Sequence, residues 1–265
     1  SKKSKYSFKL ILLVIVGTLF FMWTRFQAES SARKVRNIVL ISIDTCRMDH
    51  LSCYGFPKPT TPNIDAVAGE SILFENAVSP IPLTLPAHTS MLTGTNPVYH
   101  DVHHNLGYQV SPENLTLPEI LREQGYTTAA FIGSFVLDSK FGLDQGFDTY
   151  NDEFEDVHQA VTINERKASE TSRLAGDWLE KNRADKFFLF LHFYDPHDDY
   201  DPPEPAASKF PDDLYSGEIA YTDDCIGQVI KTLKRLGLYE SSLIIITSDH
   251  GEMLGEHNES THGFF

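Results

Sequence analysis

Apolar runs alternate along this chain with segments of helical periodicity. Residues 37–43 and 243–247 are almost wholly apolar and rich in β-branched side chains. Continuous runs of this kind are typical of parallel strands that are buried on both faces. Shorter or more aromatic runs at 72–77, 127–132 and 187–193 predict three further strands.

The segments between these runs predict helices. Apolar residues recur every three or four positions at 115–123, 170–181 and 219–233, and residues 60–65 predict a turn into a short helix. Strands that alternate with helices in this way favour a sheet with helices packed on it. We therefore expect an α/β fold, with a mostly parallel, doubly wound sheet and helices on both faces.

Acidic and histidine side chains follow two of the apolar runs. Asp44 comes directly after 37–43, and Asp249 and His250 follow 243–247 after one serine. In open α/β sheets, ligands bind in the crevice beyond the carboxyl ends of the strands, so we expect these three side chains to share one crevice. Two carboxylates and an imidazole, together with a hydroxyl oxygen, suit a divalent cation such as Zn²⁺, Mn²⁺, Ca²⁺ or Mg²⁺.

Thr84 is the candidate for that hydroxyl. It stands two positions before Pro86 in the stretch 83–94, and a proline suits the first turn of a helix. Thr84 would then lie at a helix N-terminus, where free N–H groups and the helix dipole favour an anion. This position suits a nucleophile that attacks a phosphate or sulfate ester, because a bound cation would lower the pKa of the hydroxyl. An ordinary capping threonine is the alternative.

Taken together, these motifs resemble those of the sulfatase family in the alkaline phosphatase superfamily. Residues 84–94 line up without gaps on the sulfatase signature, which reads Cys or Ser, x, Pro, x, Arg, three residues and Leu-Thr-Gly. The resemblance covers about residues 37–265 and implies an alkaline phosphatase/sulfatase-like fold. It implies that Thr84 is the nucleophile and that the metal ligands are Asp44, Thr84, Asp249 and His250. His197 stands where these enzymes have a substrate-contacting histidine, and His262 where a late lysine or histidine touches the substrate.

The sequence departs from the sulfatase pattern around the expected anion. Sulfatases oxidise the signature Cys or Ser to formylglycine, which a threonine cannot form. His88 replaces the signature arginine, Thr45 replaces a second aspartate, and 133–136 lacks the lysine and histidine of many sulfatases. Thr nucleophiles occur in phosphodiesterase and phosphoethanolamine or glycerophosphate transferase relatives. The resemblance therefore favours phosphoryl transfer.

Four further side chains are candidates for substrate binding: His88, Arg47, His104 and Asn105. Arg47 follows the first strand closely, although a surface ion pair with a nearby carboxylate is an equal alternative. His104 and Asn105 belong to a histidine cluster that follows the Thr84 helix, where one or two side chains can face the site.

The strand 187–193 brings a second group of candidates to the crevice. His197 follows the carboxyl end of this strand and is well placed for a role there. His192, on the strand itself, is more typical of a buried residue behind the site. Asp195 either orients a histidine or completes a metal site.

Residues 1–36 predict a membrane anchor and linker. Four lysines precede an uncharged stretch at 10–24, which Arg25 follows. A membrane span usually needs about 20 apolar residues, so this stretch is short and overlaps the length of a signal-peptide core. Because no suitable cleavage site follows, we favour a retained signal anchor over a cleaved signal. Either one predicts a catalytic domain outside the cytoplasm, in the periplasm or the extracellular space.

The formal charge of −15 is unevenly distributed. Residues 37–265 hold 14 basic and 36 acidic residues, a net charge of −22. So acidic a domain argues against nucleic acid as a partner. It also repels an anionic substrate, so we expect a bound metal ion to supply the local positive charge.

These observations predict an anchor and linker at 1–36 and a sulfatase-like catalytic domain at 37–265. The chain stops inside the motif that begins at His262, so we expect a C-terminal part to be missing. The expected protein is a membrane-anchored, exported, metal-dependent hydrolase that cleaves a small-molecule, glycan or lipid ester of phosphate or sulfate through Thr84, with phosphate favoured. The alternatives are a phosphoethanolamine- or glycerophosphate-type transferase of the cell envelope and a non-catalytic, sulfatase-like binding protein.

Overall fold

The computed structural model describes residues 35–154 and 165–263. The chain divides into two units, Ser1–Val35 and Arg36–Phe265, and the following description concerns the second. The stretch 10–24, for which we predict a membrane anchor, lies outside the described residues. Among the residues that are described, no helix has the length and apolar character needed to cross a membrane.

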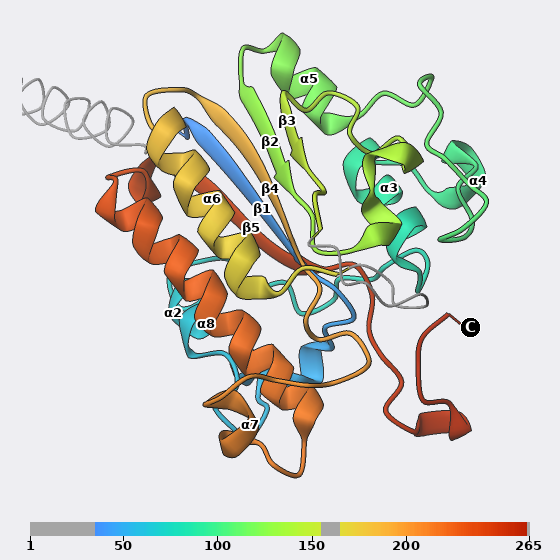
Figure 1. Ribbon diagram of the computed structural model, residues 1–265, viewed down its shortest axis with the longest axis vertical. Helices are drawn as coiled ribbons and strands as arrows, with labels where there is room; N and C mark the ends of the chain where they lie inside the picture. The colour runs from blue at the N-terminus through green and yellow to red at the C-terminus, as the bar shows by residue number, and fades with distance from the viewer. Residues whose placement is uncertain (1–34, 155–164, 264–265) are drawn as a thin grey trace, which may run out of the picture. The chain divides into compact units, whose positions relative to one another are not determined.

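Five parallel strands form one sheet in the order β3-β2-β4-β1-β5 (Figure 1). Their bounds are β1 Asn37–Ile43, β2 Thr127–Phe131, β3 Thr149–Asn151, β4 Phe187–Phe193 and β5 Ser242–Ser248. Ile43 at the end of β1 pairs with Phe193 of β4 on one side and Ser248 of β5 on the other. The carboxyl ends of these three strands are therefore level with one another.

Helices cover both faces of the sheet, as the alternation of patterns predicts (Figure 1). One face packs on α2 (Pro62–Ala68), α6 (Ala168–Asn182) and α8 (Leu214–Arg235), and the other on α3 (Thr84–Thr93) and α5 (Leu117–Glu123). Two shorter helices are α4 (Pro97–His100) and α7 (Ala206–Lys209). All seven residues of β4 are buried because this central strand has helices above and below it. The α/β fold class is confirmed.

The strand expected at 72–77 is wrong. Residues 69–83 contain no helix or strand, and no described strand pairs with them. The side chains of Ile72, Phe74 and Val78 are 82%, 70% and 90% exposed. A strand needs a neighbour for its backbone hydrogen bonds, and apolar composition alone does not provide one.

A substitution in β4 tests the two-layer core. Leu191 is fully buried, so Leu191→Ala removes packed methyl groups and leaves a cavity. We expect a loss of about 2–5 kcal/mol in the free energy of unfolding, measured by urea titration. The matched control is Leu243→Ala on β5, where the side chain is 45% exposed and the loss should stay within about 0.5 kcal/mol. Equal losses for the two variants would contradict this description of the core.

Candidate functional site

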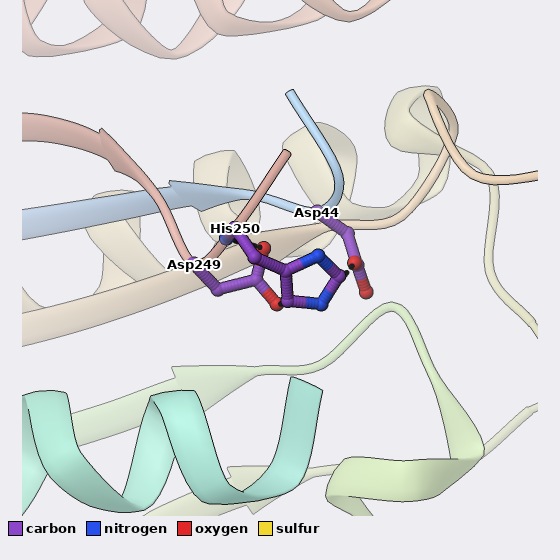
Figure 2. A group of neighbouring side chains, drawn as sticks. All are labelled: Asp44, Asp249 and His250. Atoms are coloured by element: carbon purple, nitrogen blue, oxygen red, sulfur yellow. Dashed lines mark hydrogen bonds and ion pairs between the residues drawn. The ribbon is translucent and has the colours of Figure 1, made fainter. Parts of the chain in front are cut away.

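Three elements bring polar side chains to one buried crevice at the carboxyl edge of the sheet. Asp44 directly follows β1, Asp249 and His250 directly follow β5, and Thr84 is the first residue of α3. Their exposed fractions are 5% or less, so they lie in a protected interior position. Figure 2 shows that Asp44 approaches from one strand end and the Asp249–His250 pair from the other. Asp44, Asp249 and His250, which the strand ends predict to lie together, thus form one buried cluster.

Asp44, Asp249 and His250 can act together as metal ligands. Each offers one ligand atom, and these atoms all lie within 4.8 Å of one another. Both carboxylate oxygens of Asp44 and Oδ2 of Asp249 lack a hydrogen-bond partner within the described part of the chain. Buried oxygens without donors are costly, and a divalent cation would satisfy them. The donor set of two carboxylates and one imidazole therefore fits a metal ion.

Contacts behind the cluster hold two of these ligands in place. Asp249 Oδ1 accepts hydrogen bonds from the backbone N–H groups of His250, at 2.8 Å, and Thr45, at 3.2 Å, which leaves Oδ2 facing the crevice. His250 Nδ1 donates to the carbonyl oxygen of Gly251 at 3.0 Å. Because Nδ1 carries that proton, the neutral ring keeps a lone pair on Nε2, which is the form a metal ligand needs.

Thr84 places its hydroxyl beside this cluster. Its Oγ1 lies 3.4 Å from His250 Nε2. The next backbone N–H of α3, that of Leu85, donates to Asn105 Oδ1 at 2.9 Å. Asn105 thus anchors the first turn of α3, and the Thr84 oxygen lies where the helix dipole favours negative charge.

Burial disfavours the charged form of the carboxyl groups of Asp44 and Asp249. Their other neighbours shift the two pKa values in opposite directions. For Asp44, the nearby His192 and His250 outweigh burial and hold the pKa below its usual range. For Asp249, burial and the negative charge of Asp44 raise the pKa to about 7. The two carboxylates therefore repel each other, and a cation between them would relieve this repulsion.

His197 and His262 lie next to the cluster on its more open side. The ring of His262 lies 4.5 Å from that of His250 and 5.0 Å from that of His197, measured between ring centroids. Burial lowers the pKa of His262, but Glu252, which lies 3.3 Å from its Nδ1, raises it by more. His197 Nδ1 donates to the carbonyl oxygen of Asp198 at 2.7 Å, so its Nε2 is available.

His88, predicted to bind substrate, is a residue of α3 and is fully buried between that helix and the sheet. Its Nδ1 donates to the Thr84 carbonyl oxygen at 2.7 Å, and its Nε2 lies 2.9 Å from Ser42 Oγ, which donates to it. Burial, together with His192, lowers the pKa of His88 to about 3, so the ring is neutral. A substrate contact would require one of these hydrogen bonds to break.

Arg47 and His104 bind other groups of the chain. The guanidinium of Arg47 binds Asp49 through Nε and Nη2, and its Nη1 lies 2.6 Å from Glu256 Oε1. The ion pair was one of the two alternatives for Arg47, and the structure contains it. His104 is exposed, and its Nδ1 accepts from the backbone N–H of Leu106 at 3.3 Å. Of the histidine cluster and Asn105, only Asn105 contacts the start of α3 among the described residues.

Three residues support the ligands of the site: His192, which the sequence predicts to be buried behind the site, and Tyr194 and Glu252, which the sequence analysis did not single out. His192 is buried with its Nε2 3.3 Å from Asp44 Oδ2. Tyr194 stacks on His197 at 4.5 Å between ring centroids, and its hydroxyl lies 2.9 Å from His197 Nδ1. Glu252 contacts His262. The motif Ser-Asp-His-Gly-Glu carries Glu252 two residues after a ligand, which is the one signal that could have pointed to it.

Known proteins share this fold. The ulvan-active sulfatase of Formosa agariphila is 29% identical over 266 residues, which cover 83% of this chain and 51% of that protein. A phosphonate monoester hydrolase of Agrobacterium radiobacter matches with a TM-score of 0.71 and 23% identity over 87% of this chain and 66% of that one. The lipoteichoic acid synthase LtaP of Listeria monocytogenes matches with a TM-score of 0.68 and 21% identity over 88% of this chain and 61% of that one.

The chain spans about half the length of the curated relatives that it matches. A family model described as Sulfatase matches residues 36–264, which include every residue of the metal-ligand cluster and Thr84. The fold, the buried donor set and this match agree, and the chain belongs to the sulfatase family.

Proposed function

We propose that this chain is the catalytic part of a metal-dependent ester hydrolase that uses Thr84 as its nucleophile and favours phosphate over sulfate esters. The observation that carries the proposal is the position of Thr84 Oγ1, 3.4 Å from His250 Nε2 in the same buried crevice as Asp44 and Asp249. A bound divalent cation would lower the pKa of the Thr84 hydroxyl and screen the charge of the ester.

Different residues of the chain would carry out different parts of the reaction. Asp44, Asp249 and His250 would hold the cation, and Asn105 fixes the helix turn from which Thr84 attacks. A bond forms between Thr84 Oγ1 and phosphorus while the bond from phosphorus to the leaving oxygen breaks, which gives a phosphothreonine and an alcohol. As that bond breaks, Thr84 gives up its hydroxyl proton to a neighbouring base or to solvent, and His197 or His262 holds the non-bridging oxygens or donates the proton that makes the leaving oxygen an alcohol. Water then attacks phosphorus and releases phosphate, which restores the Thr84 hydroxyl.

The preference for phosphate rests on the nucleophile and on the groups around it. A threonine cannot become formylglycine, so this chain cannot use the formylglycine-dependent mechanism of the sulfatases that it resembles. The neutral, hydrogen-bonded His88 adds no positive charge where the sulfatase signature has an arginine. Phosphorus chemistry also occurs on this fold, because a phosphonate monoester hydrolase and a lipoteichoic acid synthase are among its structural neighbours. One structural neighbour binds D-glucosamine-2-N,6-O-disulfate, so sulfated sugars are the alternative substrates.

A transferase is the second candidate, and the same Thr84 geometry supports it. A phosphothreonine can pass its group to an alcohol in place of water, and the lipoteichoic acid synthase shares the fold. The acceptor, lipid or glycan, would decide between the two reactions. We also propose that residues 1–36 anchor the protein and that the catalytic part acts outside the cytoplasm, because of the basic residues that flank the apolar stretch.

Replacing Thr84 tests the nucleophile. The assay compares nitrophenyl esters of phosphate monoester, phosphodiester and sulfate type, with Zn²⁺, Mn²⁺ or Ca²⁺ added to the full-length protein. We expect Thr84→Ala to lower kcat on the best phosphate substrate by at least about 10³-fold, because the attacking oxygen is lost. Thr84→Ser keeps the hydroxyl and should stay within about 100-fold of the parent protein. Intact-mass measurement of a quenched reaction should show phosphate on the parent and Thr84→Ser proteins alone.

Two results would count against this reading. Full turnover by Thr84→Ala would exclude Thr84 as the nucleophile. Faster turnover of sulfate than of either phosphate substrate would remove the preference for phosphate while leaving the site intact.

Removing a ligand tests the metal site. Asp249→Asn takes one negative charge from the cluster, so we expect metal binding at least about 100-fold weaker, measured by elemental analysis after dialysis, with loss of turnover. The control is Asp224→Asn, which removes the same charge from an exposed position on α8 and should change neither quantity. Unchanged metal content in Asp249→Asn would show that the cluster is not the metal site.

A further inference from the structure

A second group of buried oxygen atoms lies outside the cluster of Asp44, Asp249 and His250. Asp195 is the second residue after β4, and Glu218 and Thr222 lie on α8. Their exposed fractions are 5%, 1% and 1%. None of the three takes part in the reaction proposed above.

These side chains have oxygens that form no well-aligned hydrogen bond in the described part of the chain. Both carboxylate oxygens of Asp195, Oε2 of Glu218 and Oγ1 of Thr222 have no hydrogen-bond partner there. Glu218 Oε1 accepts from the backbone N–H of Asp201 at 2.8 Å, and the nearby backbone N–H groups of Ala168 and Asp195 lower the pKa of the Asp195 carboxyl without outweighing its burial. Buried oxygens are normally paired because an unpaired one costs free energy on folding, so this group has the composition of a binding site.

Two of the three residues are neighbours on α8, and Asp195 lies near the same helix. Glu218 and Thr222 are one helical turn apart on α8, and the side chain of Thr222 leans back toward Glu218. The negative charge of Asp195 contributes to the raised pKa values of Glu218, Tyr221 and Cys225. These three residues lie along one side of α8, so Asp195 lies near that side.

The start of α6 closes the group from another direction. The backbone N–H of Ser169 donates to the Tyr221 hydroxyl at 3.2 Å, and Ser172 Oγ donates to the carbonyl oxygen of Cys225 at 2.9 Å. These bonds hold the first turns of α6 against α8. A further buried hydroxyl without a partner, that of Thr171, belongs to the same turns.

Nearby charges do not neutralise the two carboxylates. Asp195 faces Lys167 and Glu165, and Glu218 faces Asp195, Lys167 and Asp201. Lys167 is about half exposed and lies 3.9 Å from Glu165. Burial raises the pKa of Asp195 to about 7, and burial together with Asp195 raises that of Glu218 to about 8. Positive charge is therefore deficient at this point.

We propose that Asp195, Glu218 and Thr222 form a second cation site, for a hard divalent ion of the Ca²⁺ or Mg²⁺ class. The donors are all oxygen atoms, which these ions prefer, whereas the cluster at the sheet edge includes an imidazole. A small polar cavity, which Arg166, Lys167 and His197 line, also reaches Asp195. The ion would tie the loop after β4, which carries His197, to α8.

The test separates this site from the catalytic one. Asp249→Asn, or Asp44→Asn should that variant not fold, disables the catalytic cluster and serves as the parent. After chelation and dialysis at pH 8, Ca²⁺ is titrated by calorimetry and thermal unfolding, with Mg²⁺ in parallel. We expect one Ca²⁺ per chain and a rise in Tm of about 5 °C at saturation. Adding Glu218→Gln should abolish both, whereas adding Asp224→Asn, the same charge change on the exposed side of α8, should leave both unchanged.

The pH dependence separates the cation from a shared proton. Carboxyl groups with raised pKa values contribute stability at low pH that is lost as pH rises through about 7 and 8. Because the proton must leave before the ion binds, the Tm gain from Ca²⁺ should grow between about pH 5.5 and 8.5. A Tm that falls over this range and does not respond to Ca²⁺ or Mg²⁺ at any pH would overturn the proposal in favour of a proton shared by Asp195 and Glu218. A response that survives Glu218→Gln would overturn it too.

Discussion

The site is governed by the burial of two carboxylates of like charge at the ends of neighbouring parallel strands. The pairing of Ile43 with Ser248 makes β1 and β5 end level, so Asp44 and Asp249 emerge side by side beneath the surface. Water cannot screen them there, and the charge of Asp44 adds to burial in resisting the ionisation of Asp249. A divalent cation between the two carboxylates would attract both of them. The sheet register, which places them side by side, is therefore the reason why the site suits a metal ion.

The other contacts in the site fix the positions of Asp249, His250 and Thr84 around that charge. The backbone N–H groups of Thr45 and His250 fix Asp249, and the Gly251 carbonyl selects the His250 tautomer with a free Nε2. The first turn of α3 adds its dipole beneath Thr84. Because residues 37–265 carry a net charge of −22, these local fields matter more than the overall charge, which repels an anionic ester.

The sequence predicted the strands of the sheet core and the crevice because both depend on local patterns. The runs 37–43 and 187–193 match β1 and β4, and residues that follow a strand must lie at its carboxyl end. Prediction from the sequence failed where the structure depends on contacts between residues far apart in the chain. Apolar composition at 72–77 had no neighbouring strand to pair with. The hydrogen bonds that occupy both nitrogens of His88 come from Ser42, which is 46 residues away, and from the Thr84 carbonyl.

The charge around Thr84 bears on which phosphate esters the proposed enzyme would accept. A divalent cation balances the charges of Asp44 and Asp249, and His88 is neutral, so little positive charge is left to hold a second negative charge on the substrate. His262 has a raised pKa, but the Glu252 carboxylate that raises it also offsets its charge. Arg47 is already paired with Asp49 and Glu256. On the function proposed above, so small an excess of positive charge among the described residues is balanced better by one negative charge on the ester than by two.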